Sequence, residues 1–165
     1  MDRRSFLQSL GLVTLTAGTT YWLSHPKSAK AVPPRGIYVQ MGTSVTAGLH
    51  GPGAHLSPIV VGSRLNLTPI NVGFGGGYTG TLHYPDSDAF SLCCLVDAVI
   101  SGDWSAQDKA VAAFDPAFIS ILNRLKAIDF SKVTHLALEY GTNDFTHAVS
   151  IGTNTDTTKE TFKGA

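Results

Sequence analysis

The sequence is poor in cysteine and in charge, and neither sign of charge dominates. Its 165 residues include only two cysteines, Cys93 and Cys94, and because these are adjacent they exclude a disulfide framework and a zinc-ligand spacing. Twelve Lys and Arg residues balance twelve Asp and Glu residues, so the clustered basic face of a nucleic-acid-binding protein is not expected. Heptads, tandem repeats and low-complexity tracts are also lacking. The remaining composition, 43% hydrophobic, suits one folded domain of modest size.

The first 31 residues have the features of an export signal. A weakly apolar run from Ser9 to Leu23 follows two arginines and precedes the small-x-small sequence Ala29-Lys30-Ala31. The segment Arg3-Arg4-Ser5-Phe6-Leu7 resembles the twin-arginine signal, which exports folded proteins across a bacterial membrane. We therefore expect a signal peptide over residues 1–31, a periplasmic or extracellular protein, and membrane contact through this segment alone. An uncleaved anchor is the alternative, because the run approaches the length of a membrane span.

Alternating strand and helix patterns follow a short linker. Residues 32–35, Val-Pro-Pro-Arg, predict a stiff linker, and residues 36–165 form the domain. Strands are predicted over residues 36–41, 67–72 and 133–140, and helices over residues 58–66, 87–100 (with Ser87 as its cap), 108–114 and 118–128, with another beginning near residues 158–160. This alternation predicts an α/β domain with a parallel sheet and helices on both of its faces.

Three polar loops follow the three predicted strands. They are Gly42-Thr43-Ser44, the glycine run from Gly73 to Gly77, and Gly141-Thr142-Asn143-Asp144. Ligands of parallel sheets bind at the carboxyl ends of the strands, so we expect the three loops to form one site.

Each loop has a functional interpretation and a plainer one. Ser44 on a strand-to-helix turn can present a nucleophilic hydroxyl or simply cap the next helix. The glycine run can let a substrate approach backbone N–H groups or form a flexible turn. Asn143 can donate to a developing oxyanion or stabilise an Asx-turn.

In this order the blocks Gly42-Thr43-Ser44, Asn71-Val72-Gly73-Phe74-Gly75-Gly76 and Gly141-Thr142-Asn143-Asp144 resemble the first three blocks of the SGNH/GDSL hydrolase family. The resemblance implies a serine esterase or acylhydrolase on a flavodoxin-like, three-layer α/β/α fold. It also implies that Ser44 is the nucleophile, and that the Ser44 N–H, the Gly76 N–H and the Asn143 side chain form the oxyanion hole. Neither a metal ion nor a cofactor is expected.

Two departures from the family pattern concern charge and the general base. The family usually has Asp where this chain has Thr43, which can form hydrogen bonds but carries no charge. The family takes its base from a later Asp-x-x-His block, and Asp144-Phe145-Thr146-His147 is the one literal match. Because Asp144 already belongs to the third block, we expect the catalytic Asp and His beyond Ala165. The sheet is then incomplete at its C-terminal side, and the chain alone is nearly inactive.

The sequence thus predicts an exported serine ester hydrolase that acts on a small-molecule ester or deacylates carbohydrate. A non-catalytic carbohydrate-binding or structural domain of the same fold is the alternative. A nucleotide-binding module is disfavoured, because the phosphate-binding pattern Gly-x-x-x-x-Gly-Lys-Ser/Thr is missing. Cys93 and Cys94 are expected as reduced thiols on a helix rather than as a vicinal disulfide. The sequence predicts no oligomeric state.

Overall fold

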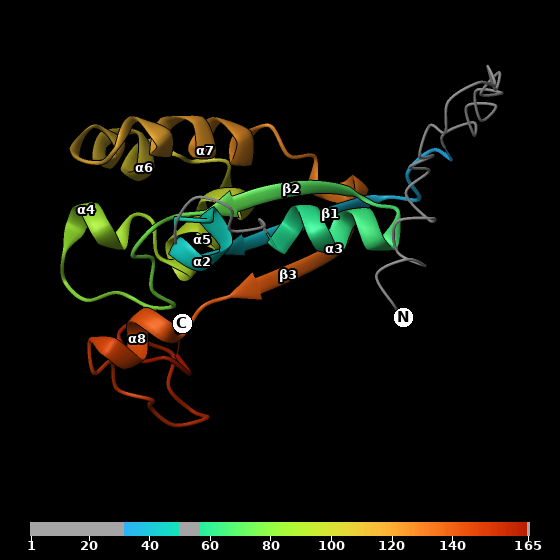
Figure 1. Ribbon diagram of the computed structural model, residues 1–165. Helices are drawn as coiled ribbons and strands as arrows, with labels where there is room; N and C mark the ends of the chain where they lie inside the picture. The colour runs from blue at the N-terminus through green and yellow to red at the C-terminus, as the bar shows by residue number, and fades with distance from the viewer. Residues whose placement is uncertain (1–31, 50–56, 165) are drawn as a thin grey trace, which may run out of the picture. The chain divides into compact units, whose positions relative to one another are not determined.

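A three-stranded parallel sheet lies at the centre of the fold (Figure 1). β1 (Ile37–Gly42) lies between β2 (Thr68–Gly73) and β3 (Val133–Glu139), in the order β2-β1-β3. The computed structural model describes residues 32–49 and 57–164, so the predicted signal peptide lies outside the described residues. The predicted α/β fold with a parallel, helix-flanked sheet is confirmed. The strand order is also that of the first three strands of a flavodoxin-like sheet.

Helices flank the sheet on both faces. On one face the Gln40 side chain donates to the Ser57 hydroxyl at the start of α3, whereas Val39 packs on the opposite face with leucines of α5 and α7. None of the described helices is both long enough and apolar enough to span a bilayer. The helices are α2 (Ser44–Ala47), α3 (Ser57–Leu65), α4 (Pro85–Asp88), α5 (Leu92–Ser101), α6 (Ser105–Ala110), α7 (Pro116–Lys126) and α8 (Thr142–Thr146), with 3₁₀ turns η1 (Val111–Ala113) and η2 (Phe130–Lys132).

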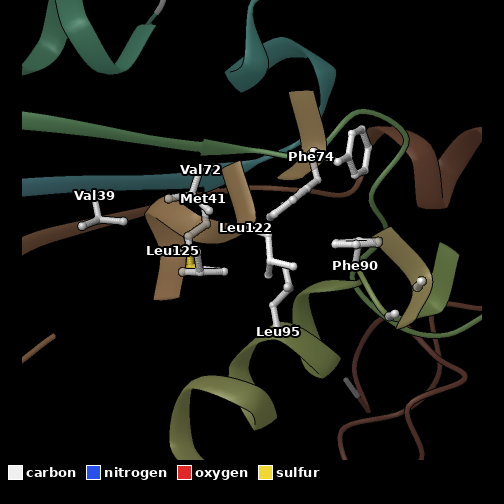
Figure 2. Close-up of a cluster of buried hydrophobic side chains, with 11 residues drawn as sticks. Val39, Met41, Val72, Phe74, Phe90, Leu95, Leu122 and Leu125 are labelled. Carbon is white, nitrogen blue, oxygen red and sulfur yellow. The ribbon is translucent and has the colours of Figure 1, made fainter. Parts of the chain in front are cut away.

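The hydrophobic core lies between the sheet and the helices α5 and α7. Figure 2 shows side chains of β1 and β2 grouped with leucines of the two helices and with aromatic rings. The ring centroids of Phe74 and Phe90 are 4.9 Å apart, and Phe118 lies 5.3 Å from each of them. Such aromatic clusters contribute about 0.5–1.5 kcal/mol per pair beyond their buried area. The core therefore fixes Phe74, within the glycine loop, and Phe90, in the segment after it.

Helix α7 forms where its sequence pattern predicts. The Asp115 carboxylate accepts a hydrogen bond from the Ala117 N–H at 2.8 Å, and Pro116 occupies the first turn, where it costs no hydrogen bond. Phe118, Leu122 and Leu125 are buried along one side. The capping residues and the apolar stripe therefore predict the same helix, and the structure confirms it.

The prediction of a single helix over residues 87–100 is wrong. The chain forms α4 and then a separate helix, α5, whose cap is Ser91 rather than Ser87. The first two N–H groups of α5, those of Leu92 and Cys93, donate to the carbonyls of Tyr78 and Thr79. Because these acceptors come from the segment after the glycine loop, tertiary contacts help to fix the start of α5, in addition to the local cap at Ser91.

Three smaller expectations are also corrected. The helix predicted over residues 108–114 begins earlier, as α6, and ends in the 3₁₀ turn η1. No helix forms near residues 158–160, where the described chain makes only turns. The predicted polar loop Gly141–Asp144 contains the start of α8, which begins at Thr142 after a left-handed Gly141 (φ +106°).

The outer edge of β2 is blocked to further strands. Pro69 has no N–H to offer, the Asn71 carbonyl accepts from Arg124 Nη1 at 2.7 Å, and the Gly73 N–H donates to the Asn71 side chain at 2.9 Å. On the opposite edge strand, β3, Leu136 and Leu138 are about half exposed. The two edge strands therefore differ: backbone groups of β2 are already hydrogen-bonded or missing, whereas β3 carries half-exposed leucines.

Candidate functional site

The three polar loops leave the sheet at the same edge. In the pairing register Gly42 lies beside Gly73 on one side and beside Glu139 on the other, so all three strands end at the same level. Figure 1 shows α2 at the carboxyl end of β1 and α8 beyond the carboxyl end of β3. Ser44, the glycine loop and Asn143 thus all lie beyond the carboxyl edge, as the sequence predicts.

Ser44 is the first residue of α2, on a sharp turn out of β1. Its preceding residue, Thr43, is the N-cap, with extended backbone angles and 1% exposure, while Ser44 itself is half-buried. A side chain at Gly42 would collide with Thr46, and one at Gly73 would collide with the backbone of Ala47. Two glycines therefore let the helix that carries Ser44 close onto the strand ends.

Hydrogen bonds attach α2 to both neighbouring strands. On the β2 side the Asn71 amide donates to the Thr46 carbonyl at 2.7 Å. On the β3 side one carboxylate oxygen of Glu139, Oε2, accepts from the Thr43 hydroxyl at 2.9 Å. The turn that carries Ser44 is thus held from two directions by side chains of adjacent strands.

The glycine loop contains one backbone conformation that favours glycine. Gly76 has φ +78°, it is exposed, and a Cβ there would meet no atom within 4 Å. The turn is closed by the Gly77 N–H, which donates to the Phe74 carbonyl at 3.2 Å. The Gly76 N–H donates no hydrogen bond to another described residue.

Asn143 lies in contact with the glycine loop. Its side-chain Nδ2 donates to the Gly77 carbonyl at 2.8 Å, across 66 residues of sequence. A primary amide has two N–H bonds, so one remains for another acceptor. The structure thereby brings together two of the three predicted components, the glycine loop and Asn143, by a direct hydrogen bond.

Asp144 is buried and committed to the segment after the glycine loop. It is 3% exposed, and its two carboxylate oxygens accept from the Thr79 N–H at 2.9 and 3.1 Å, while the Thr79 hydroxyl donates at 3.2 Å. These bonds hold α8 against the glycine-loop segment. The same bonds give the buried Asp144 carboxylate a structural role.

Both ring nitrogens of His147 contact groups other than Ser44. Nδ1 lies 2.9 Å from the Asn143 carbonyl oxygen, and Nε2 lies 3.5 Å from the Tyr78 hydroxyl, with the two rings edge to face. Within the described part of the chain, no hydrogen bond joins this imidazole to Ser44. The two histidines nearest to Ser44 in sequence, His50 and His55, lie outside the described residues.

Tyr140 is the one buried hydroxyl beside the site that lacks a partner among the described residues. Burial raises the pKa of this phenol, and the neighbouring Glu139 and Asp144 carboxylates raise it further. The group therefore stays protonated at physiological pH and cannot act as a base. Among residues 32–49 and 57–164, no cluster of three His, Cys, Asp or Glu side chains could hold a metal ion.

Comparisons with protein families, with curated proteins and with solved structures found no match for this chain.

Sequence reasoning missed three of the residues that build this edge. The sequence analysis assigns no role to Asn71 or Glu139, and it does not predict that the Asp144 carboxylate holds the Thr79 N–H. The signal that points to Glu139 is a carboxylate that follows the apolar run Leu136-Ala137-Leu138 and lies two residues before the polar block at Gly141.

Proposed function

We propose that this protein is an exported serine ester hydrolase of the SGNH/GDSL type, with Ser44 as its nucleophile. The supporting observation is that the turn carrying Ser44, the glycine loop and Asn143 lie at one edge of the sheet. A hydroxyl, backbone N–H groups and a side-chain amide at one edge are the groups that serve as nucleophile and oxyanion hole in acyl transfer.

In the proposed mechanism the Ser44 Oγ attacks the ester carbonyl carbon. A general base takes the hydroxyl proton and passes it to the leaving alcohol. The Ser44 N–H, the Gly76 N–H and the free N–H of the Asn143 amide stabilise the negative charge on the tetrahedral intermediate. Water then attacks the acyl-enzyme and releases the carboxylic acid. The family resemblance assigns the base to the histidine of a later Asp-x-x-His block, in keeping with the contacts that His147 makes elsewhere.

The proposed substrate is a small-molecule ester or an acylated carbohydrate. This assignment follows the family resemblance and the twin-arginine-like segment, which would place the enzyme outside the cytoplasm, where it meets extracellular glycans. No cofactor takes part in the proposed reaction.

The test is hydrolysis of p-nitrophenyl acetate by the full natural chain and by its Ser44→Ala variant. In subtilisin, loss of the serine nucleophile lowers kcat about 10⁶-fold, and we expect a loss of that order here. The matched control is Ser63→Ala, an exposed serine on α3, which should leave turnover unchanged. Undiminished turnover by Ser44→Ala would refute the serine mechanism.

A non-catalytic carbohydrate-binding domain is the second candidate, favoured by the engagement of both His147 ring nitrogens elsewhere. Titration calorimetry with acetylated and deacetylated oligosaccharides separates the two candidates. Binding without turnover, unchanged by Ser44→Ala, would support the second.

A further inference from the structure

We infer that Glu139 is a positioning residue that holds the turn carrying Ser44 in place. The inference rests on the proposed function, because it concerns how that nucleophile is presented. Glu139 ends β3 and pairs with Gly42, the last residue of β1. Its side chain therefore lies beside the point where the chain leaves β1 for α2.

One carboxylate oxygen of Glu139 gathers three donors from the turn. Oε2 accepts from the Thr43 N–H at 3.2 Å, from the Thr43 hydroxyl at 2.9 Å and from the Thr46 hydroxyl at 3.2 Å. Both threonines are buried, at 1% and 0% exposure, and they stand on either side of Ser44 in the sequence. Glu139 thus fixes both the residue before Ser44 and the helical turn after it.

A chain of buried hydrogen bonds leads from Tyr38 on β1 to the same carboxylate. The Tyr38 hydroxyl donates to Gln40 Oε1 at 2.8 Å, and Gln40 Nε2 donates to the Thr46 hydroxyl at 3.0 Å. The Thr46 hydroxyl must then use its own proton toward Glu139, because it has only one to give. This chain of donors therefore leads to the carboxylate, while Gln40 Nε2 also donates to the Ser57 hydroxyl.

Negative charge at Glu139 matters for the strength of these contacts. Hydrogen bonds to an ionised acceptor are roughly twice as strong as neutral ones. Among the described residues, no Lys, Arg or His forms an ion pair with Glu139. The carboxylate is therefore stabilised by the donors of the Ser44 turn, and it in turn holds that turn. Thr43 lacks the charge that the family usually has at this position, and Glu139 supplies a carboxylate there from the neighbouring strand.

Placement of a nucleophile controls kcat more than it controls substrate affinity. A displacement of about 1 Å can cost about 10²-fold in rate. Loss of the Glu139 contacts should therefore lower kcat while KM changes little. A residue needed only for folding would instead lower the fraction of active enzyme and the unfolding temperature, without this pattern.

The experiment measures kcat and KM for p-nitrophenyl acetate in the full natural chain. The variants are Glu139→Gln, Thr43→Val, which removes the hydroxyl at nearly constant volume, and the double variant. We expect each single variant to lower kcat about 10-fold or more, with KM within about twofold. The double variant should be no worse than the worse single variant, because both remove the same contact. Active sites are titrated so that kcat refers to folded enzyme.

Two controls make the result specific. Glu160→Gln changes an exposed glutamate whose Oε1 lies 3.7 Å from His83 Nε2, and it should leave kcat unchanged. Thr43→Ser keeps the donor hydroxyl and should retain most of kcat. If Glu139→Gln does not fold, the contrast between Thr43→Val and Thr43→Ser still tests the contact from its other side.

The outcomes separate this inference from the proposed function. If Ser44→Ala abolishes turnover while Glu139→Gln and Thr43→Val keep kcat within twofold, the positioning role is wrong and the serine mechanism stands. If Ser44→Ala remains fully active, the proposed function is wrong, and the positioning role is wrong with it. A 10-fold loss of kcat in both single variants without additivity supports the inference.

Discussion

The side-chain amide of Asn143 donates a hydrogen bond to the backbone carbonyl of Gly77 at 2.8 Å. This bond joins the start of α8 to the loop after β2, two segments that are distant in sequence. It fixes the direction of the amide, so its second N–H has a defined orientation as well.

Replacing Asn143 by Ala should lower esterase kcat by about 10²–10³, the usual effect of losing one oxyanion donor. KM should change little, because the oxyanion develops only in the transition state. The control is Asn123→Ala, an exposed position on α7. Steady-state kinetics of the full natural chain provide the measurement, and a kcat within twofold of the parent would remove Asn143 from the oxyanion hole.

Gly73→Ala should destabilise the fold more than Gly102→Ala. The new methyl group at Gly73 would meet the backbone of Ala47 in α2, and backbone cannot rotate aside as a side chain can. Overpacking of this kind costs about 1–3 kcal/mol. Gly102 has φ +74° but open space around it, so its cost is the backbone strain of about 1 kcal/mol. Urea unfolding compares the two, and equal losses would contradict the close approach of α2.

Asp144→Ala should lower the free energy of unfolding by about 1–3 kcal/mol or more. It leaves the buried N–H of Thr79 without its acceptor. Asp86→Ala removes an exposed carboxylate from α4 and should stay within about 0.5 kcal/mol. Denaturant unfolding with matched m-values is the measurement. An Asp144→Ala variant as stable as Asp86→Ala would show that α8 is not held by this carboxylate.

Alkylation should distinguish the two free cysteines of α5. A hydrogen bond from Cys93 lowers the pKa of the Cys94 thiol to about 6, with burial opposing and Ser91 assisting the shift. The pKa of Cys93 is raised, first by that same hydrogen bond and then by burial. The thiolate form of Cys94 therefore increases as pH rises through about 6, and it is nearly complete at pH 7.5.

Iodoacetamide should accordingly label Cys94 at pH 7 while Cys93 remains unmodified, as read by peptide mass mapping. The alkylation rate should level off above pH 7, since only the thiolate reacts. The matched variant Cys93→Ala removes the hydrogen bond and should move the midpoint of the rate profile upward. A parent rate that still climbs steeply between pH 8 and pH 9 would contradict the lowered pKa.

The sequence alone predicts those elements in which the capping residues and the pattern of apolar residues indicate the same structure. Strand β1 is a short β-branched and aromatic run, and α7 has a capping Asp115, a first-turn Pro116 and a regular apolar stripe. The three polar loops could be placed at one edge, because parallel strands that end in register bring their carboxyl ends together.

The errors arose where distant segments decide local structure. The start of α5 depends on carbonyls of Tyr78 and Thr79, which no pattern within α5 reveals. The role of Glu139 likewise depends on donors that lie 93 and 96 residues earlier in the chain. Periodicity describes which face of an element is apolar, and it does not describe which polar groups will meet across a sheet.

The unequal edges of the sheet restrict how it can grow. Pro69, Arg124 and the side chain of Asn71 occupy or remove the outward backbone groups of β2, so an incoming strand would have few partners there. Enlargement is thereby confined to one direction. Any strand that joined, from whichever polypeptide, would have to align with β3 and would lie beside the half-exposed Leu136 and Leu138.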